Sequence, residues 1–140
     1  MIGDDMSPKF FAGTGNGVGS GFTAAKTQAD VMAKQDIAGQ IQTEVVSLIE
    51  ASVANKQLSN TEAASITEVV MASKELIVQS LSRTLPAIEV YKDLENGYTE
   101  VMLRCYYARE TAKQATLDII KGELEQKSGK LHEKLDRLTF

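Results

Sequence analysis

The sequence has one cysteine, one histidine and no tryptophan among its 140 residues, and these shortages exclude several classes of protein. A single cysteine, Cys105, excludes an internal disulfide. His132 is the only histidine, and no cysteine lies near it, so the usual nitrogen and sulfur ligands of a metal site are missing. We therefore expect no bound metal and no other cofactor.

The sequence also lacks a long apolar run and an excess of positive charge. No stretch of about 18 apolar residues is present to span a bilayer. The net charge is −4, whereas proteins that bind nucleic acid present a basic face to the phosphates, so we expect no nucleic-acid partner. The opening Met-Ile-Gly-Asp-Asp-Met lacks the regions of a secretory signal, so we expect either a cytoplasmic protein or a mature form without its leader.

What the sequence does contain is enough apolar content for a folded domain. Hydrophobic residues make up 43% of the chain and charged residues 24%, which is typical of a globular protein and too apolar for disorder. A chain of this length fits a single domain. We place a loose tail at residues 1–8, one domain at residues 9–125 and a helical extension at residues 126–140.

The composition of the first part of the chain changes from glycine-rich to alanine-rich. Residues 9–12 are apolar enough for a short strand, and glycine follows at every second position from 13 to 21, which predicts a flexible connection to a helix. From Thr23 small or aliphatic residues recur at every fourth position, as on the buried stripe of a helix. They are Ala25, Ala29, Ala33, Ile37 and Ile41.

The middle of the chain contains one ambiguous segment and one clear helix. Residues 43–54 have aliphatic side chains at helical spacing, but their many β-branched residues favour a strand, which is what we predict. A helix is then expected over residues 61–82, with Ser59 or Asn60 as its N-cap. Pro86 disfavours helix at and just before its position, so the helix ends before it.

Two strand-like runs between residues 87 and 108 flank the pair Asn96-Gly97. Asn-Gly supplies the two positive-φ positions of a type I′ turn, so a β-hairpin is predicted. In its second strand, odd-numbered residues face one side of the sheet and even-numbered residues the other. The sequence thus predicts an α+β fold, in which a small antiparallel sheet with a strand-helix-strand-strand core and a C-terminal β-hairpin is packed by two helices and followed by a C-terminal amphipathic helix.

The last segment, from about Glu110, is helical by propensity and has an apolar stripe that is interrupted at Ser128-Gly129. The stripe consists of Leu117, Ile120, Leu124, Leu131, Leu135 and Leu138. A helix of this kind that projects from a small domain has an apolar seam to bury against a partner.

No pattern in the sequence predicts catalysis. The glycines do not fit Gly-x-Gly-x-x-Gly, because Val18 and Ser20 stand where the third glycine is needed. Cys105 alternates with apolar residues as a buried side chain does, and we expect His132 to be a solvated helix residue. Acidic residues that are close in sequence lie in a tail, a turn and a helix surface, where burial would not raise their pKa for acid-base chemistry. They are Asp4 with Asp5, Asp93 with Glu95, and Glu123 with Glu125.

Several stretches together resemble a known family. They are Phe10-Phe11-Ala12-Gly13-Thr14-Gly15, Ala24-Ala25-Lys26-Thr27-Gln28-Ala29, Asp36-Ile37-Ala38-Gly39-Gln40-Ile41, Ser73-Lys74-Glu75-Leu76-Ile77 and Asn96-Gly97-Tyr98-Thr99-Glu100-Val101-Met102-Leu103. Over roughly residues 9–125 their succession resembles the LPP-twenty family of bacterial envelope lipoproteins, which includes flagellar disc lipoproteins. The resemblance implies a location in the periplasm or outer membrane, and attachment to the membrane only through an N-terminal lipid on a cysteine upstream of Met1. It supplies no catalytic residue.

We therefore expect a non-enzymatic structural or assembly protein of the cell envelope, which forms a homo-oligomer or scaffolds other envelope proteins, for example in a flagellar complex. The alternative is a small ligand- or anion-binding module that uses the glycine-rich segment and the N-terminus of the first helix. Self-association is expected through a sheet edge, the tyrosine-bearing face of the hairpin or the C-terminal leucine stripe, and the last two supply the candidate interface residues. They are Tyr98, Met102, Tyr106, Leu124, Leu131, Leu135 and Leu138.

Overall fold

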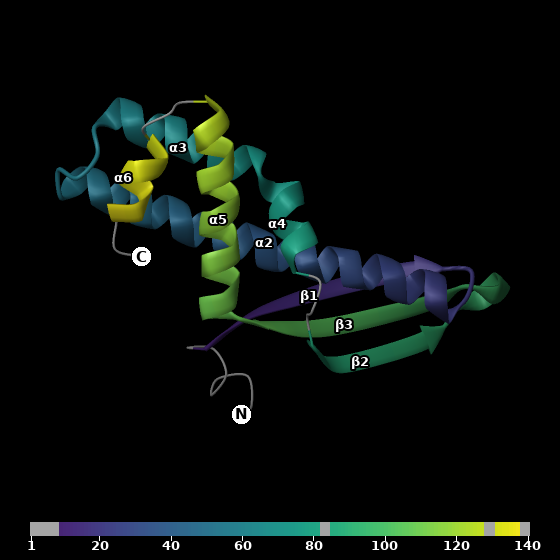
Figure 1. Ribbon diagram of the computed structural model, residues 1–140. Helices are drawn as coiled ribbons and strands as arrows, with labels where there is room; N and C mark the ends of the chain where they lie inside the picture. Colours follow the sequence, from purple (N-terminus) through teal and green to yellow (C-terminus); the bar gives the residue numbers. More distant parts are fainter. Residues whose placement is uncertain (1–8, 82–84, 128–130, 138–140) are drawn as a thin grey trace.

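The computed structural model describes residues 9–81, 85–127 and 131–137, which form one antiparallel sheet and five α-helices (Figure 1). The elements follow one another as β1 (Phe10–Gly19), α2 (Phe22–Ala54), α3 (Asn60–Ala72), α4 (Lys74–Ser80), β2 (Leu85–Asp93), the short 3-10 turn η1 (Glu95–Gly97), β3 (Thr99–Ala108), α5 (Arg109–Lys127) and α6 (Leu131–Arg137). The predicted α+β class is confirmed. The predicted tail at residues 1–8 lies outside the described residues.

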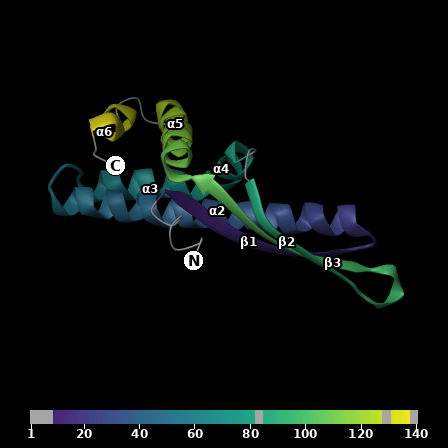
Figure 2. The ribbon, with the colours of Figure 1, turned by 90° about the horizontal axis from the view of Figure 1, so that it is seen from below.

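The sheet has the strand order β1-β3-β2, so its two edges are formed by strands that are far apart in the sequence. Both pairings are antiparallel, with Phe11 opposite Tyr107 and Val90 opposite Met102. In the described part of the chain the helices lie on one side of the sheet, and the other face is open (Figures 1 and 2). The described helices therefore cover one face of the sheet and leave its other face exposed to solvent.

α2 is one helix of 33 residues, so the strand predicted for residues 43–54 is wrong. That prediction gave most weight to β-branched side chains, but the spacing of the apolar residues decides the structure here. Ile41, Val45 and Ile49 recur at every fourth position and are at most 2% exposed. Burial of this face against α3 outweighs the small cost of β-branched residues in a helix.

β1 continues through the glycine-rich segment, so the flexible connection predicted there is also wrong. Gly13, Gly15 and Gly17 lie against the backbone of α2. A Cβ atom on Gly15 would lie 2.7 Å from the Ala33 nitrogen and closer still to the Ala29 carbonyl oxygen. Two strand residues advance about 6.6 Å and four helix residues about 6 Å, so glycines two apart can face alanines four apart. The glycines thus let α2 lie directly on the strand.

The predicted start of the next helix is confirmed in atomic detail. Ser59 is the N-cap of α3, and its hydroxyl accepts a hydrogen bond of 3.1 Å from the Glu62 N–H. The Glu62 carboxylate in turn accepts one of 3.0 Å from the Ser59 N–H. This reciprocal pair is a capping box, in which side chains satisfy N–H groups that have no partner within the helix.

The helix predicted over residues 61–82 is divided in two at Ser73. The Ser73 hydroxyl is buried and donates to the Val69 carbonyl at 2.7 Å, an arrangement that favours a bend in a helix. After the bend, Ile77 is fully buried, whereas its neighbour Leu76 is 40% exposed.

The predicted hairpin is confirmed. Asn96 and Gly97 have φ values of 66° and 78°, the two left-handed positions that the Asn-Gly pair was expected to supply. The Leu94 N–H donates to the Tyr98 carbonyl at 2.7 Å and closes the turn. Between Pro86 and Ile88 the register of β2 shifts, which marks a bulge near the start of that strand.

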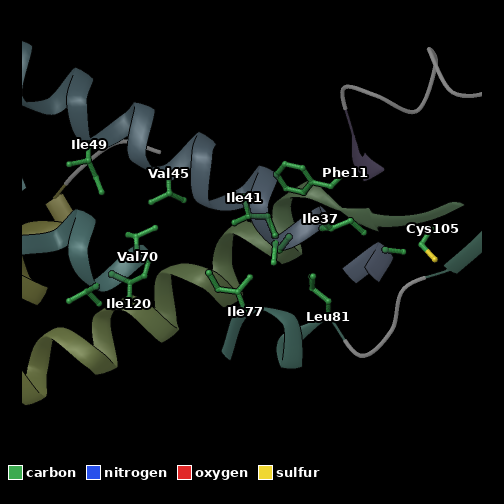
Figure 3. Close-up of a cluster of buried hydrophobic side chains, with 14 of the residues drawn as sticks. Phe11, Ile37, Ile41, Val45, Ile49, Val70, Ile77, Leu81, Cys105 and Ile120 are labelled. Carbon is green, nitrogen blue, oxygen red and sulfur yellow. The ribbon is translucent and has the colours of Figure 1, made fainter. Parts of the chain in front are cut away.

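The apolar core lies between the sheet and the helices and continues between α2 and the helices that follow it (Figure 3). Ile41 and Ile49 from α2 lie on the same core as Val70 from α3 and Ile120 from α5. At the sheet end, Cys105 is fully buried, as the alternation in its strand predicted. One continuous core therefore joins the sheet to the helical end of the molecule.

Candidate interaction surface

The open face of the sheet presents an exposed apolar side chain from each of its three strands. Val18 on β1, Met102 on β3 and Val90 on β2 are 46%, 49% and 50% exposed. The register places Met102 between Val90 on one side and Asn16 on the other. Met102 was predicted as an interface residue, and the structure places it on the central strand of this face. Exposed apolar groups that gather on one face are a common feature of contact surfaces.

A hollow of 480 Å³ lies beside Met102. It is lined by Thr14, Gly15, Asn16, Met32, Val90, Met102, Leu103 and Arg104. One charged side chain is present in this lining, and the Arg104 Nε already donates to the Tyr106 hydroxyl at 3.1 Å. The hollow therefore suits an apolar side chain of another protein better than a charged small molecule.

The two tyrosines predicted as interface residues differ in their exposure. Tyr98 follows the hairpin turn and is 49% exposed, so it is accessible as expected. Tyr106 is only 6% exposed, because the Phe10 ring packs edge-on against it and the Arg104 guanidinium lies over it. The open face is thus covered by side chains around Tyr106 and is accessible to solvent nearer the hairpin turn.

The C-terminal leucines do not form the exposed seam that the sequence predicted. Leu124 is 1% exposed and Leu135 is 3% exposed, within the core of the same chain. Leu131 is partly buried against that core, and Leu138 lies outside the described residues. α5 packs against α3, and α6 packs back onto α5, so the chain covers this stripe itself.

The β1 edge of the sheet is closed by side chains from α2. Odd-numbered residues of β1 form the hydrogen-bonded pairs with β3, so the N–H and C=O groups of the even-numbered residues point away from the sheet. Three of these groups have partners on α2: the Thr14 N–H donates to Asp36 at 2.9 Å, the Val18 N–H donates to Gln28 at 2.7 Å, and the Ala12 carbonyl accepts from Gln40 at 2.7 Å. Side chains in these positions prevent another strand from pairing there.

Reasoning from the sequence missed this closure, although a signal for it was present. Gln28, Asp36 and Gln40 lie at multiples of four residues from one another, directly beside the alanine stripe. Met32 occupies the remaining position of that row and lies in the hollow next to Asn16. In the folded chain this row lies along the β1 edge, and its polar side chains reach the strand's outward backbone groups.

The β2 edge has a different character. Even-numbered residues of β3 form the hydrogen-bonded pairs with β2, so Val90 and Lys92 point their backbone groups inward, and those of Glu89, Tyr91 and Asp93 point outward. In the part of the chain that the structure describes, no residue pairs with these outward groups. The sequence led us to expect contact through a sheet edge but not to say which one, because the register that exposes this edge becomes visible only in the folded sheet.

A charged cluster fixes α5 to α2 where β3 ends. The Glu44 carboxylate lies 2.8 Å from the Arg109 guanidinium and 2.6 Å from the Lys113 ammonium. Burial raises the pKa of the Glu44 carboxyl, but the hydrogen bonds and charges of Lys113 and Arg109 outweigh it and hold the pKa below its usual value. Arg109 also lies over the Phe11 ring at 4.2 Å, so the cluster rests on the core.

The remaining chemically distinctive residues lie apart from one another. Burial, and secondly the charge of Asp30, raise the pKa of the Cys105 thiol. His132 was expected to be solvated, but it is partly covered: its Nε2 lies 3.8 Å from the Glu125 carboxylate, and its Nδ1 is buried without a hydrogen-bond partner in the described structure. Asp93 and Glu95 are exposed.

Within residues 9–81, 85–127 and 131–137, no three acidic, histidine or cysteine side chains gather as metal ligands would. No helix in the same ranges has the length and apolar character needed to cross a membrane. The glycine segment, which the alternative hypothesis used as an anion loop, is a strand covered by α2. Comparisons of the chain with models of protein families, with curated proteins and with solved structures found no match.

Proposed function

We propose that this chain is a non-enzymatic assembly module of the bacterial cell envelope that binds copies of itself through the uncovered side of its sheet. One observation supports the proposal most strongly: helices cover a single face of the sheet, and the other face presents Val18, Val90 and Met102 to solvent. Apolar groups gathered in this way gain stability when a partner removes them from water.

The envelope location rests on the resemblance to the LPP-twenty lipoproteins. A lipid-anchored module is confined to one membrane, where even weak contacts between copies give stable assemblies. Expression from the native gene with labelled palmitate tests the location. We expect the label on the protein and recovery in the outer-membrane fraction; an unlabelled protein in the cytoplasmic fraction would contradict this part of the proposal.

Self-association is tested by light scattering over a wide range of protein concentration, on the parent chain and on two matched variants. Met102→Glu places a charge on the open face, and we expect it to lower the average mass of the assembly. Met71→Glu makes the same change at a side chain that is 57% exposed on α3, a helix that packs against other helices, and we expect no effect. A parent chain that is monomeric at every concentration would refute self-association.

A further inference from the structure

The two edges of the sheet differ in their capacity to accept another strand. On the β1 edge, Gln28, Asp36 and Gln40 already occupy three outward backbone groups. On the β2 edge, the regular stretch after the bulge presents the outward N–H and C=O groups of Glu89 and Tyr91 with no partner in the described residues. Unpaired edge groups are a template for strand addition.

We propose that β2 pairs antiparallel with β2 of a second copy, with Val90 facing the second copy's Val90 across a twofold axis. This inference rests on the proposed function, in which copies of the chain bind one another, and adds strand pairing at the β2 edge that borders the open face. The occupant is a second copy because the edge is complementary to itself in one register and to no other edge of this molecule.

Charge selects that register. Outward residues must lie opposite outward residues, which allows pairings centred on any residue from Glu89 to Asp93. Centring on Glu89 or on Asp93 sets two carboxylates directly against each other. Centring on Tyr91 sets Glu89 against Asp93, and centring on Lys92 sets two lysines against each other; like charges directly opposite are destabilising. Centring on Val90 sets Glu89 against Tyr91, with no like charges opposed among these residues. It also joins two valines at a position of close side-chain approach.

The closed β1 edge limits growth by strand pairing. Pairing of β1 with β2 would join copies head to tail and continue without end, but the α2 side chains obstruct it. Pairing of β2 with β2 uses the same surface on both copies and stops at two. The result is a six-stranded sheet on whose open face Val90 and Met102 of both copies lie side by side.

Disulfide cross-linking of variants that carry one added cysteine tests the register directly. Opposed residues in an antiparallel pair have Cα atoms about 4.5 to 5.5 Å apart, which is within the range that a disulfide bridges. We expect Val90→Cys to give the fastest oxidative cross-link to a dimer, with Tyr91→Cys and Lys92→Cys slower. The native Cys105 is fully buried and does not compete. A faster cross-link from either neighbour, or none from Val90→Cys, would overturn the proposal.

A matched pair of charge variants separates this inference from the proposed function. Val90→Lys places two lysines on the axis and is expected to raise the dimer dissociation constant about tenfold or more. Val31→Lys makes the same change on α2, outside the sheet and with similar exposure (44% against 50%), and is expected to leave the constant unchanged. A parent chain that is always monomeric defeats both proposals. An assembly weakened by Met102→Glu but not by Val90→Lys defeats β2 pairing alone.

Discussion

Replacement of Gly15 by alanine should destabilise the protein, because its new methyl group would have no space. The Cβ would lie 2.7 Å from the Ala33 nitrogen and closer to the Ala29 oxygen, and both obstacles are main-chain atoms of α2 that cannot rotate away. Overpacking of a core costs about 1–3 kcal/mol, and a rigid obstacle favours the upper end. Alanine recovers about 0.7 kcal/mol by restricting the unfolded chain, which leaves a net loss of about 2 kcal/mol.

Thermal unfolding followed by circular dichroism measures this loss. At about 4 °C per kcal/mol for a chain of this size, Gly15→Ala should lower the Tm by about 8 °C. Gly39→Ala is the control, since no atom lies within 4 Å of its added Cβ and it stands inside α2. That variant should gain about 0.7 kcal/mol and raise the Tm by about 3 °C. A Gly15→Ala protein as stable as the parent would refute the close packing of β1 on α2.

Three further predictions concern single side chains. Glu44→Gln should lower the free energy of unfolding near neutral pH. Because folding lowers the pKa of the Glu44 carboxyl, the ionised carboxylate stabilises the fold fully above its ordinary pKa of 4.5, and this stabilisation declines as the pH falls below that value. The acid denaturation curves of parent and variant should therefore converge. Cys105 should react with a thiol reagent only after urea unfolding, because it is buried and its pKa is raised; fast labelling of the native protein would contradict its placement. Leu124→Ala should reduce the free energy of unfolding by about 3 kcal/mol without changing the mass of the assembly, since this side chain lies in the core of its own chain.

Local patterns in the sequence were sufficient for several elements. The cap at Ser59 and the turn at Asn96-Gly97 depend on residues within four positions of each other, and both were predicted. The buried stripe that begins at Ala25 was predicted for the same reason, because its period is a property of one helix. Cys105 was placed correctly by the alternation within its strand.

The errors arose where a residue's role depends on a distant partner. β-branched residues at 43–54 suggested a strand because their favourable packing against α3 is not visible locally. The glycines suggested flexibility because their local sequence does not show that α2 packs directly against them. Of the candidate interface, Met102 and Tyr98 are exposed, whereas Tyr106 and Leu124 are covered by other parts of the chain.

The sequence by itself determined the α+β class, the hairpin with its turn, the cap of α3 and the alanine stripe of α2. Each of these follows from backbone preference or from periodicity over a few turns. Only the tertiary structure decided that the glycines accommodate a helix, that α6 buries its own leucines and that one sheet edge is closed while the other is open. These features depend on which surfaces meet when distant segments pack. Whether a side chain is buried, or a backbone group finds a hydrogen-bond partner, is decided by contacts between elements and not by the sequence within one element.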